Sequence, residues 1–269
     1  MNHQHSIHLS HAAISDALRK SGCVFAEDEA RMLMAHASTS EDLKSIVEQR
    51  IDGLPLEYIL GWAEFFGLRL VVEPGVFVPR RRTEFLLRQA IRVLPEAAVV
   101  VDLCCGSGAL GAGLLAVQRN LTMYAVDIDP RALHCARQNL PDHARVYQGD
   151  LYQPLPSELR GSVDVLVTNA PYVPTEAIAL LPQEARVYEA RMAIDGGLDG
   201  LDIQRRIVAS APTWLAPGGH LLMETSSLQA HQTLDLFVTN GLVAQIAHSA
   251  SADGTVVIGK RATVSSRVQ

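Results

Sequence analysis

Apolar residues recur every three or four positions through the first sixty residues, and this spacing places them on one face of a helix. One such face carries Ala13, Ala17 and Leu18, and similar faces follow before residue 50. Serines precede two of these stretches, where a side chain can cap the first turn of a helix. They are Ser10 and Ser40. We therefore predict a small helical N-terminal domain, residues 1–60, with its own apolar seam.

The character of the sequence changes between residues 61 and 77. Aromatic and β-branched residues dominate this stretch, and Gly67 and the Pro74-Gly75 pair interrupt it. Aromatic and β-branched residues favour extended backbone, whereas glycine and proline favour turns. We expect a hairpin or linker over 61–77.

Helical and strand patterns alternate from residue 78 to residue 269. A helix capped by Thr83 opens the series, and a later helix starts at Asp129-Pro130. Short, solidly apolar stretches predict strands between the helices. These strands are 98–102, 122–127, 145–147, 163–169, 220–225, 242–247 and 255–260. The alternation indicates an α/β fold, with a mostly parallel sheet that helices cover on both faces.

The last two predicted strands lie close together, with no helical stretch between them. A parallel crossover needs a dozen or more residues. These two strands are therefore expected to pair as an antiparallel hairpin.

The composition favours a soluble, cytoplasmic protein. No apolar run approaches the roughly 18 residues that a membrane-spanning helix needs, so no membrane partner is expected. The first residues, MNHQHSIHLSH, lack the basic and apolar regions of a secretory signal. Four cysteines without paired CxxC spacing argue against both a disulfide framework and a structural zinc site. We expect no bound metal.

The charge balance bears on the partner. The 269 residues include 23 Lys and Arg against 29 Asp and Glu, a formal net charge of -6. Phosphate neutralisation supplies most of the affinity for nucleic acid, so stable nucleic-acid binding is not expected. A small molecule or a protein is the favoured partner, and we expect the chain to be a monomer.

A glycine-rich turn follows the first predicted strand of the α/β region. It consists of Cys104, Cys105, Gly106, Ser107 and Gly108 and leads into a helix. Ligands of open α/β sheets bind at this place, and glycine lets the backbone approach them without an obstructing Cβ. We predict that these five residues bind a cofactor. Because GSGALG also satisfies GxGxxG, a nicotinamide-dependent dehydrogenase is the alternative.

Three aspartates follow the ends of successive strands and narrow the choice of cofactor. A carboxylate at Asp102 would attract an ammonium group and repel a pyrophosphate. Asp127 is suited to the two hydroxyls of a ribose, and Asp150 to an adenine amine, with Leu151 beneath the ring. An amino-acid tail, a ribose and an adenine together indicate S-adenosylmethionine. The alternative is that these aspartates merely cap the following helices.

The fourth strand of the series ends in Asn169, Ala170, Pro171 and Tyr172. The stiff turn after the strand is expected to place the Asn169 amide in the substrate crevice, next to the cofactor that it also helps to bind. The Asn169 side-chain oxygen and the Ala170 carbonyl can then accept the two N–H bonds of a planar nitrogen, and Tyr172 can stack on it. Such a nitrogen is a poor nucleophile, so catalysis would come mainly from positioning. An ordinary Asn-Pro turn is the alternative.

These segments, taken together, resemble the HemK/PrmC family of release-factor glutamine methyltransferases. The stretch LPLEYILGWAEFFGLRLVVEPGVFVPRRRTEFL (54–86) is similar to the family's joining region. It is followed in family order by VVDLCCGSGALG, AVDIDPRAL, VTNAPYVP and ARMAIDGGLDGLD. The resemblance implies a seven-stranded, Rossmann-like class I methyltransferase domain over 78–269. It also implies that a glutamine of a peptide chain release factor, in its Gly-Gly-Gln motif, is the acceptor, and that Asn169 to Tyr172 bind it.

The chain departs from the family at three places. Ala170 replaces the first proline of NPPY, Arg81 and Arg82 replace a proline and an acidic residue, and Cys104-Cys105 replaces a glycine and a small residue. A divergent member is therefore expected. The arginines can guide an acidic partner or form a solvated face.

Other functions compete with this prediction. An adenine exocyclic-amine methyltransferase acting on nucleic acid also uses NPPY-type motifs, although it must flip its base out of the stack. A dehydrogenase and a catalytically silent relative that acts as a binding module are the further alternatives. For the favoured reaction, the N-terminal domain is expected to recognise the acceptor protein.

Overall fold

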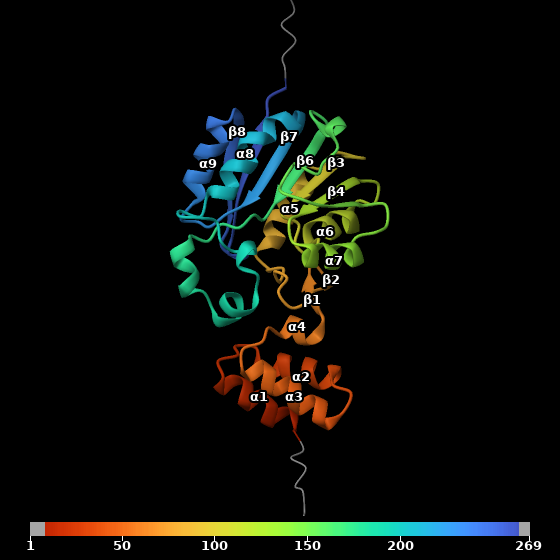
Figure 1. Cartoon of the computed structure of the whole chain (residues 1–269), viewed down its shortest axis with the longest axis vertical. Helices are drawn as coiled ribbons and strands as arrows, with labels where there is room; N and C mark the ends of the chain where they lie inside the picture. The colour runs from red at the N-terminus through yellow and green to blue at the C-terminus, as the bar shows by residue number, and fades with distance from the viewer. Residues whose placement is uncertain (1–8, 264–269) are drawn as a thin grey trace, which may run out of the picture.

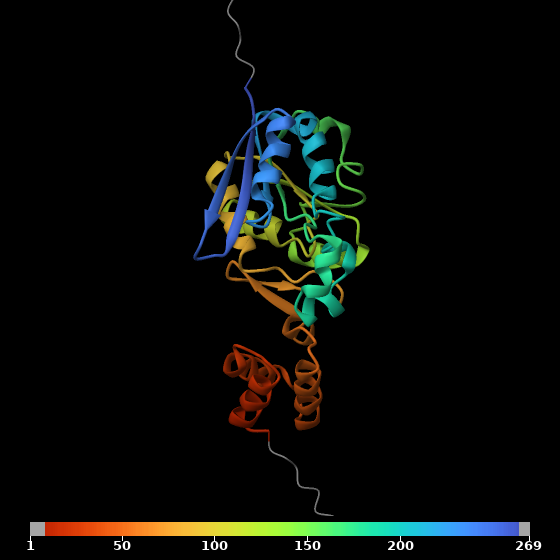
Figure 2. The same ribbon diagram turned by 90° about the vertical axis from the view of Figure 1, so that its left-hand side faces the viewer.

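The computed structural model describes residues 9–263. A helical bundle lies at one end of the long axis, an α/β unit forms the other end, and a short helix and a hairpin lie between them (Figures 1 and 2). The helices of the N-terminal part are α1 (His11–Lys20), α2 (Ala26–His36), α3 (Ser40–Ile51) and α4 (Leu56–Leu60). Residues 1–8, which belong to the segment expected to lack a secretory signal, lie outside the described residues.

The predicted N-terminal helices are confirmed, and they share an apolar cluster that includes Ile14, Leu18 and Leu33, all fully buried. Ser10 caps α1 as predicted, since its side chain accepts the N–H of Ala13. The prediction of Ser40 as a cap is wrong. Thr39 has the extended backbone of a cap and accepts the N–H of Asp42, whereas Ser40 is the first residue of the helix. Both residue types cap well, so the sequence did not separate them.

The hairpin expected within 61–77 is present as β1 (Trp62–Phe65) and β2 (Leu68–Val71), which pair antiparallel. Phe66 and Gly67 turn the chain with positive φ angles of 54° and 75°. Two hydrogen bonds join β2 to Asn139 in the α/β unit: the side chain accepts the N–H of Val71 at 2.7 Å and donates to its carbonyl at 2.9 Å. These two hydrogen bonds attach the hairpin to the α/β unit.

The main sheet has seven strands in the order β5-β4-β3-β6-β7-β9-β8. Strands β3 to β7 are parallel, and β9 is antiparallel to both of its neighbours. The predicted α/β fold and its terminal hairpin are confirmed. The strands are β3 (Val99–Leu103), β4 (Thr122–Asp127), β5 (Arg145–Gln148), β6 (Val163–Thr168), β7 (Leu215–Glu224), β8 (Leu242–Ser249) and β9 (Gly254–Arg261).

Helices cover both faces of this sheet. On one face pack α5 (Thr83–Val93), α6 (Ala109–Val117) and α7 (Pro130–Asn139), and on the other α8 (Asp202–Trp214) and α9 (Ala230–Thr239). Successive residues of β3 point to opposite faces of the sheet. Val100 packs in the core beneath α5, α6 and α7, and Val101 packs in the core beneath α8 and α9. Thr83 does not cap α5, because Arg82 occupies the cap position and Thr83 is the buried first residue of the helix. Within 9–263, no helix is long and apolar enough to cross a membrane.

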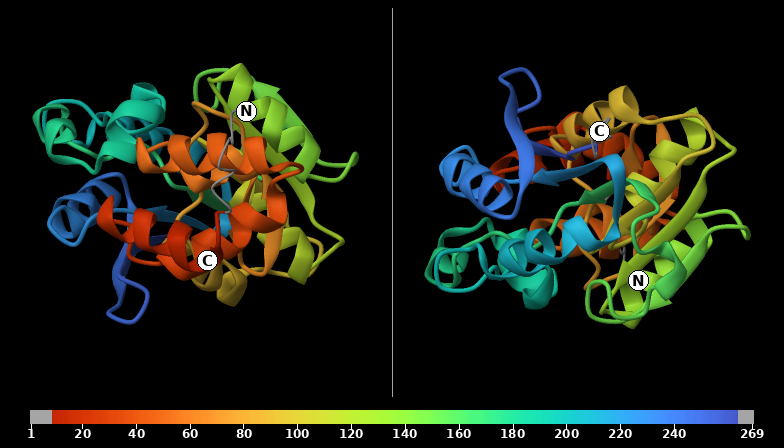
Figure 3. Two further views of the ribbon diagram at one scale, coloured as in Figure 1. Left: turned by 90° about the horizontal axis from the view of Figure 1, so that it is seen from below. Right: turned by 90° about the horizontal axis from the view of Figure 1, so that it is seen from above.

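The connection 175–193, which contains the short turns η2 (Thr175–Leu180), η3 (Glu184–Tyr188) and η4 (Arg191–Ala193), extends from the α/β unit towards the bundle. The views along the long axis show the bundle lying across one end of the molecule (Figure 3). Sequence patterns did not indicate that the connection 175–193 would approach the N-terminal bundle.

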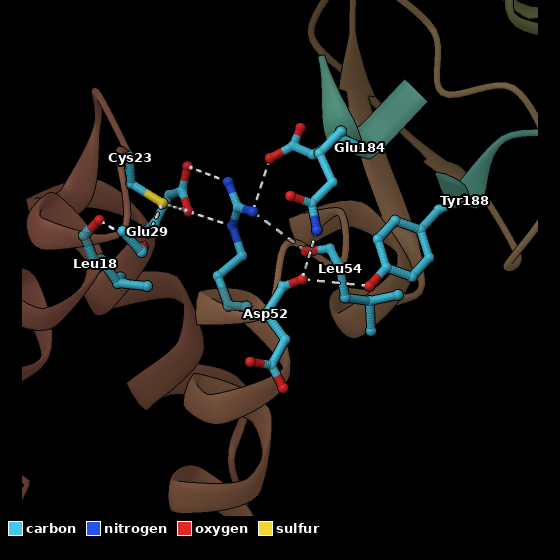
Figure 4. A network of polar contacts seen from close by, with 10 residues as sticks. Leu18, Cys23, Glu29, Asp52, Leu54, Glu184 and Tyr188 are labelled. Carbon is cyan, nitrogen blue, oxygen red and sulfur yellow. Dashed lines mark hydrogen bonds and ion pairs between the residues drawn. The ribbon is translucent and has the colours of Figure 1, made fainter. Parts of the chain in front are cut away.

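Arg50 joins the two parts through Glu29 and Glu184, which are labelled in Figure 4. Its guanidinium lies 2.6 Å from Glu29 within the bundle and 2.7 Å from Glu184 of the connection. The carbonyl of Asp52 accepts a further hydrogen bond from Tyr188, at 3.4 Å. Because the Arg50 side chain is only 8% exposed and that of Glu29 12%, this ion pair is shielded from solvent.

We predict that Arg50→Met lowers the free energy of unfolding by roughly 3 kcal/mol, because Glu29 would remain buried without its cation. Urea denaturation followed by circular dichroism measures this loss. Arg31→Met is the matched control, since its pair with Asp28 is exposed and contributes little. Equal losses in the two variants would contradict a structural role for the buried pair.

Candidate active site

A cavity of about 320 Å³ opens at the carboxyl ends of the central strands. It lies beside β3, which has β4 on one side and β6 on the other. At this point the strand order reverses: β4 and β5 are added on one side of β3, and the later strands on the other. Open α/β sheets bind their ligands at this switch point. Residues from the glycine-rich turn, the ends of β4 and β6, and the connection 175–193 line the cavity. Among them are Cys104, Cys105, Gly106, Ser107, Asp127, Asp150, Leu151, Asn169 and Pro171.

The glycine-rich turn borders the cavity with its backbone. Gly106 has a φ of 55°, and a methyl group on its Cα would meet no atom within 4 Å, which leaves open space on the cavity side. Gly108 lies behind the turn, where an added Cβ would come within 3.3 Å of Ala136 and Leu140. Gly106 thus leaves space for a ligand, while Gly108 allows the helix to pack.

The two cysteines of this turn are packing groups. Cys104 has a φ of 55°, in the left-handed region that favours glycine. Burial raises the pKa of the Cys104 thiol and also that of Cys105, so both stay protonated. Neither is a nucleophile in this state.

Asp127 holds the turn in place. Its carboxylate accepts the N–H of Gly106 at 2.8 Å and that of Asp129 at 2.9 Å. Burial raises its pKa, and these backbone hydrogen bonds oppose the rise. Each oxygen keeps a free lone pair, and the side chain lines the cavity. The arrangement allows Asp127 to bind two hydroxyl groups while it supports the turn.

Asp102 does not line the cavity. It is fully buried behind the turn, and one oxygen accepts the N–H of Gly111 at 3.1 Å. The other oxygen has no hydrogen-bond partner among the described residues. Burial raises the pKa of Asp102 to about 7. An unpaired, buried acceptor at this position fits a nearby positive charge, although the sequence suggested more direct contact with the ligand.

Asp150 and Leu151 line the next part of the cavity, beyond Asp127. The Asp150 carboxylate pairs with Arg206 of α8 at 2.6 Å, and Arg206 also lines the cavity. The sequence did not point to Arg206, because it lies 56 residues after Asp150 and belongs to no recognisable motif.

Asn169 follows β6 directly and lines the cavity together with Pro171. Its Nδ2 donates to the hydroxyl of Thr83 at 3.3 Å. Ala170 is 1% exposed, and within 9–263 its carbonyl accepts no hydrogen bond. The sequence therefore places two oxygen acceptors, one on a side chain and one on the backbone, next to each other at this strand end.

Of the tetrapeptide 169–172, only Asn169 and Pro171 line the cavity, whereas Ala170 and Tyr172 do not. The Tyr172 hydroxyl lies 3.4 Å from Glu224 at the end of β7, and burial raises its pKa to about 12. Tyr172 is not among the residues that line the cavity, and its stacking on the substrate stays a prediction.

The sequence DGGLDG, residues 195–200, forms a turn that holds the tetrapeptide. Val173 donates to the carbonyl of Ile194, and Gly196 donates back to Val173. A Cβ on Gly200 would lie 2.3 Å from the Tyr172 carbonyl, so only glycine fits there. The side chain of Gln229 donates to that same carbonyl at 2.9 Å.

The three consecutive arginines have different surroundings. Arg80 pairs with Glu189 at 2.6 Å and Arg82 with Glu224 at 3.3 Å, and both glutamates are almost completely buried. Arg81 is exposed. A solvated face and a guide for an acidic partner are thus both incomplete descriptions, because two of the arginines neutralise buried carboxylates.

Known proteins share this combination of elements. Residues 67–197 match the family described as Methyltransferase small domain. A release factor glutamine methyltransferase of Geobacter sulfurreducens is 40% identical over 201 residues, covering 74% of this chain and 70% of that protein. One from Mycolicibacterium smegmatis is 37% identical over 220 residues, covering 80% and 78%. The chain belongs to the release factor glutamine methyltransferase family.

Membership of the release factor glutamine methyltransferase family confirms the predicted family and enzyme class over the dehydrogenase alternative. The methyl donor of such an enzyme is S-adenosylmethionine. Among solved structures, a methyltransferase from Pyrococcus furiosus has a TM-score of 0.55 at 16% identity and covers 74% of this chain and 91% of that chain. This likeness shows the fold alone.

We predict that Asp102 makes the cofactor-free methyltransferase less stable as the pH rises. Its pKa is about 7 in the folded protein against 3.8 in the unfolded chain, so the folded state favours the proton. This contribution is complete below about pH 4 and is lost as the pH rises through 7. Relative to wild type, Asp102→Asn should therefore gain on the order of 4 kcal/mol between pH 4 and pH 8.

Urea denaturation of both proteins across this pH range measures the gain. Asp164→Asn is the control, since Asp164 is a partly exposed aspartate that accepts the N–H of Val99 outside the cavity. A difference between wild type and Asp102→Asn that stays constant with pH would contradict the assignment.

Proposed function

We propose that this chain transfers a methyl group from S-adenosylmethionine to the side-chain amide nitrogen of a glutamine in the Gly-Gly-Gln motif of a peptide chain release factor. The observation that carries the proposal is that Asn169, directly after β6, lines the cavity, while the Ala170 carbonyl next to it in the chain accepts no hydrogen bond within 9–263. The names of the relatives support the acceptor.

The cavity fits the donor. The two oxygens of Asp127 suit the ribose hydroxyls, and Asp150 with Leu151 suits the adenine. Asp102, buried behind the glycine-rich turn, would act on the ammonium end only through its charge. Residues 104–107, which line the cavity, would bind along the same molecule through their backbone. When bound, S-adenosylmethionine supplies an electrophilic sulfonium methyl group.

The chain's own residues position the nucleophile. An amide nitrogen attacks poorly because its lone pair is delocalised into the carbonyl. Asn169 Oδ1 and the Ala170 carbonyl would accept its two N–H bonds, and this would draw the nitrogen towards pyramidal geometry and direct its lone pair to the methyl carbon. Orientation of this kind can contribute on the order of 7–11 kcal/mol. The methylated nitrogen then releases its extra proton easily, so a strong base is not required.

The N-terminal bundle, within residues 1–60, is proposed to recognise the acceptor protein, while 78–269 bind the donor and react. The bundle reaches the cavity wall through the connection 175–193, whose Ala190, Met192 and Ala193 line the cavity. We further propose that the enzyme works in the cytoplasm, as a monomer, during translation termination.

The direct test is incubation with labelled S-adenosylmethionine and full-length release factors, followed by mass spectrometry of the product. We expect label on the glutamine of Gly-Gly-Gln and none on a factor in which that glutamine is changed to alanine. A single-stranded oligonucleotide tests the alternative, methylation of an adenine amine, which the net charge of -6 disfavours. Label on the oligonucleotide alone would overturn the proposal.

Asn169→Ala is expected to reduce turnover by roughly 100-fold or more, because it removes one oriented acceptor at the reacting nitrogen. Affinity for S-adenosylmethionine should remain within about threefold of wild type, as measured by calorimetry. Parallel losses of affinity and turnover would contradict the role proposed for this side chain.

Asp127→Ala is expected to weaken S-adenosylmethionine binding by at least roughly tenfold, since it removes the carboxylate that supports the turn and faces the ribose. Calorimetric titration of the purified variant measures this. Asp142→Ala, at an exposed position, is the control for a general effect of losing one negative charge. Unchanged affinity in Asp127→Ala would remove Asp127 from the donor site.

A further inference from the structure

The side chain of Asn169 has two ends of nearly the same shape, an oxygen and an NH2 group. Only the oxygen can accept an N–H bond from a substrate nitrogen. Asn169 Nδ2 donates to Thr83 Oγ1, so the oxygen is the end that remains for the cavity. The contact with Thr83 thus selects the useful orientation of the amide.

Thr83 alone does not fix this orientation, because a hydroxyl can donate as well as accept. If Thr83 donated to Asn169, the amide would turn round and present its NH2 group to the cavity. The direction of the Thr83 hydrogen therefore needs a second partner that can only accept.

Glu224 is that partner. It is 2% exposed at the end of β7, and its Oε1 lies within 3.4 Å of Arg82 Nε and the Tyr172 hydroxyl. Its Oε2 has no partner of ordinary hydrogen-bond geometry within 9–263, so the carboxylate lacks a donor on that side. Burial raises the pKa of Glu224, and the nearby Thr83 hydroxyl and Arg82 guanidinium oppose this rise.

The fold brings these groups together from three places in the sequence. Helix α5 starts with Thr83 and packs against β6 and β7, whose carboxyl ends carry Asn169 and Glu224. Arg82 precedes Thr83, and its guanidinium lies 3.3 Å from Glu224 Oε1, where its positive charge opposes the rise in the Glu224 pKa.

We propose that Glu224 and Thr83 are positioning residues that set the direction of the Asn169 amide. Glu224 accepts the hydrogen of Thr83, the Thr83 oxygen is left to accept from Asn169 Nδ2, and the Asn169 oxygen is held for the substrate nitrogen. The kinetic consequence rests on the proposed function, since the direction of the amide matters only to a substrate that donates N–H bonds.

Thr83→Val and Thr83→Ser form a matched pair for the kinetic test. With S-adenosylmethionine and a full-length release factor, Thr83→Val should lower kcat about tenfold or more and leave the KM for S-adenosylmethionine within about twofold. Thr83→Ser keeps the hydroxyl and should stay within about threefold of wild-type kcat. Thr239→Val, at an exposed position on α9, controls for the substitution itself. A fall in kcat in the serine variant as large as that in the valine variant would overturn the inference.

Glu224→Gln tests whether the effect passes through Thr83. The new amide can donate to the Thr83 oxygen, which would reverse the direction of the hydrogen bonds and turn Asn169 round. We expect kcat to fall at least tenfold in the wild-type background and by less than twofold in the Thr83→Val background. Equal effects in the two backgrounds would show that Glu224 acts independently of Thr83, contrary to the proposal.

Nuclear magnetic resonance tests the arrangement without any reaction. In protein labelled with ¹⁵N, the side-chain amide signals of Asn169 are identified by their absence from Asn169→Ala. They should shift in Thr83→Val and in Glu224→Gln and stay close to wild type in Thr83→Ser. Signals that do not respond to Thr83→Val would overturn the inference even if the enzyme is active. Conversely, if wild type methylates no release factor, the proposed function fails and these shifts still decide the hydrogen bonding.

Discussion

The shape of the donor cavity depends on hydrogen bonds between strand-end carboxylates and the backbone of the glycine-rich turn. Asp127 accepts the N–H of Gly106, and Asp102 accepts the N–H of Gly111. Burying two carboxylates so close together is unfavourable, as the raised pKa of each indicates. The N–H donors offset only part of this cost. A ligand that brings positive charge and hydroxyl groups close to these carboxylates would offset more of it.

A second group of buried carboxylates, Glu189 and Glu224, is neutralised by arginines of one short segment, residues 80–82. Arg80 reaches Glu189 and Arg82 reaches Glu224, so residues just before α5 neutralise acids contributed by the connection 175–193 and by β7. The same segment carries Thr83, which contacts Asn169. Arg82, one of the positions at which this chain departs from its family, therefore lies within the network around the Asn169 side chain. This location explains why arginine is tolerated at position 82, since the buried Glu224 lies nearby.

The sequence was sufficient to predict the seven strands, the cofactor turn and the position of Asn169, because these features are local or follow from chain order. It could not reveal partners that only the folded chain brings together, such as Arg206 with Asp150 or Thr83 with Asn169, which lie 56 and 86 residues apart. The pattern also could not show that Asp102 lies behind the turn or that Tyr172 points inward, because both depend on side-chain direction at a strand end. The cap of α3 was missed by one residue, since Thr39 and Ser40 are equally suitable chemically.

Loss of the first proline of the NPPY motif removes a constraint on the backbone at Ala170, yet neighbouring elements supply others. The tetrapeptide leads directly into Val173, which exchanges hydrogen bonds with the turn 195–200, and Gln229 holds the Tyr172 carbonyl from a third direction. Ala170 itself is buried, so its methyl group packs in the core instead of moving in solvent. A proline ring would reduce the freedom of the unfolded chain, but it would leave the hydrogen bonds of Val173 and Gln229 around the turn unchanged. The backbone geometry at residues 169 and 170 therefore depends more on the packing around the turn than on the identity of residue 170.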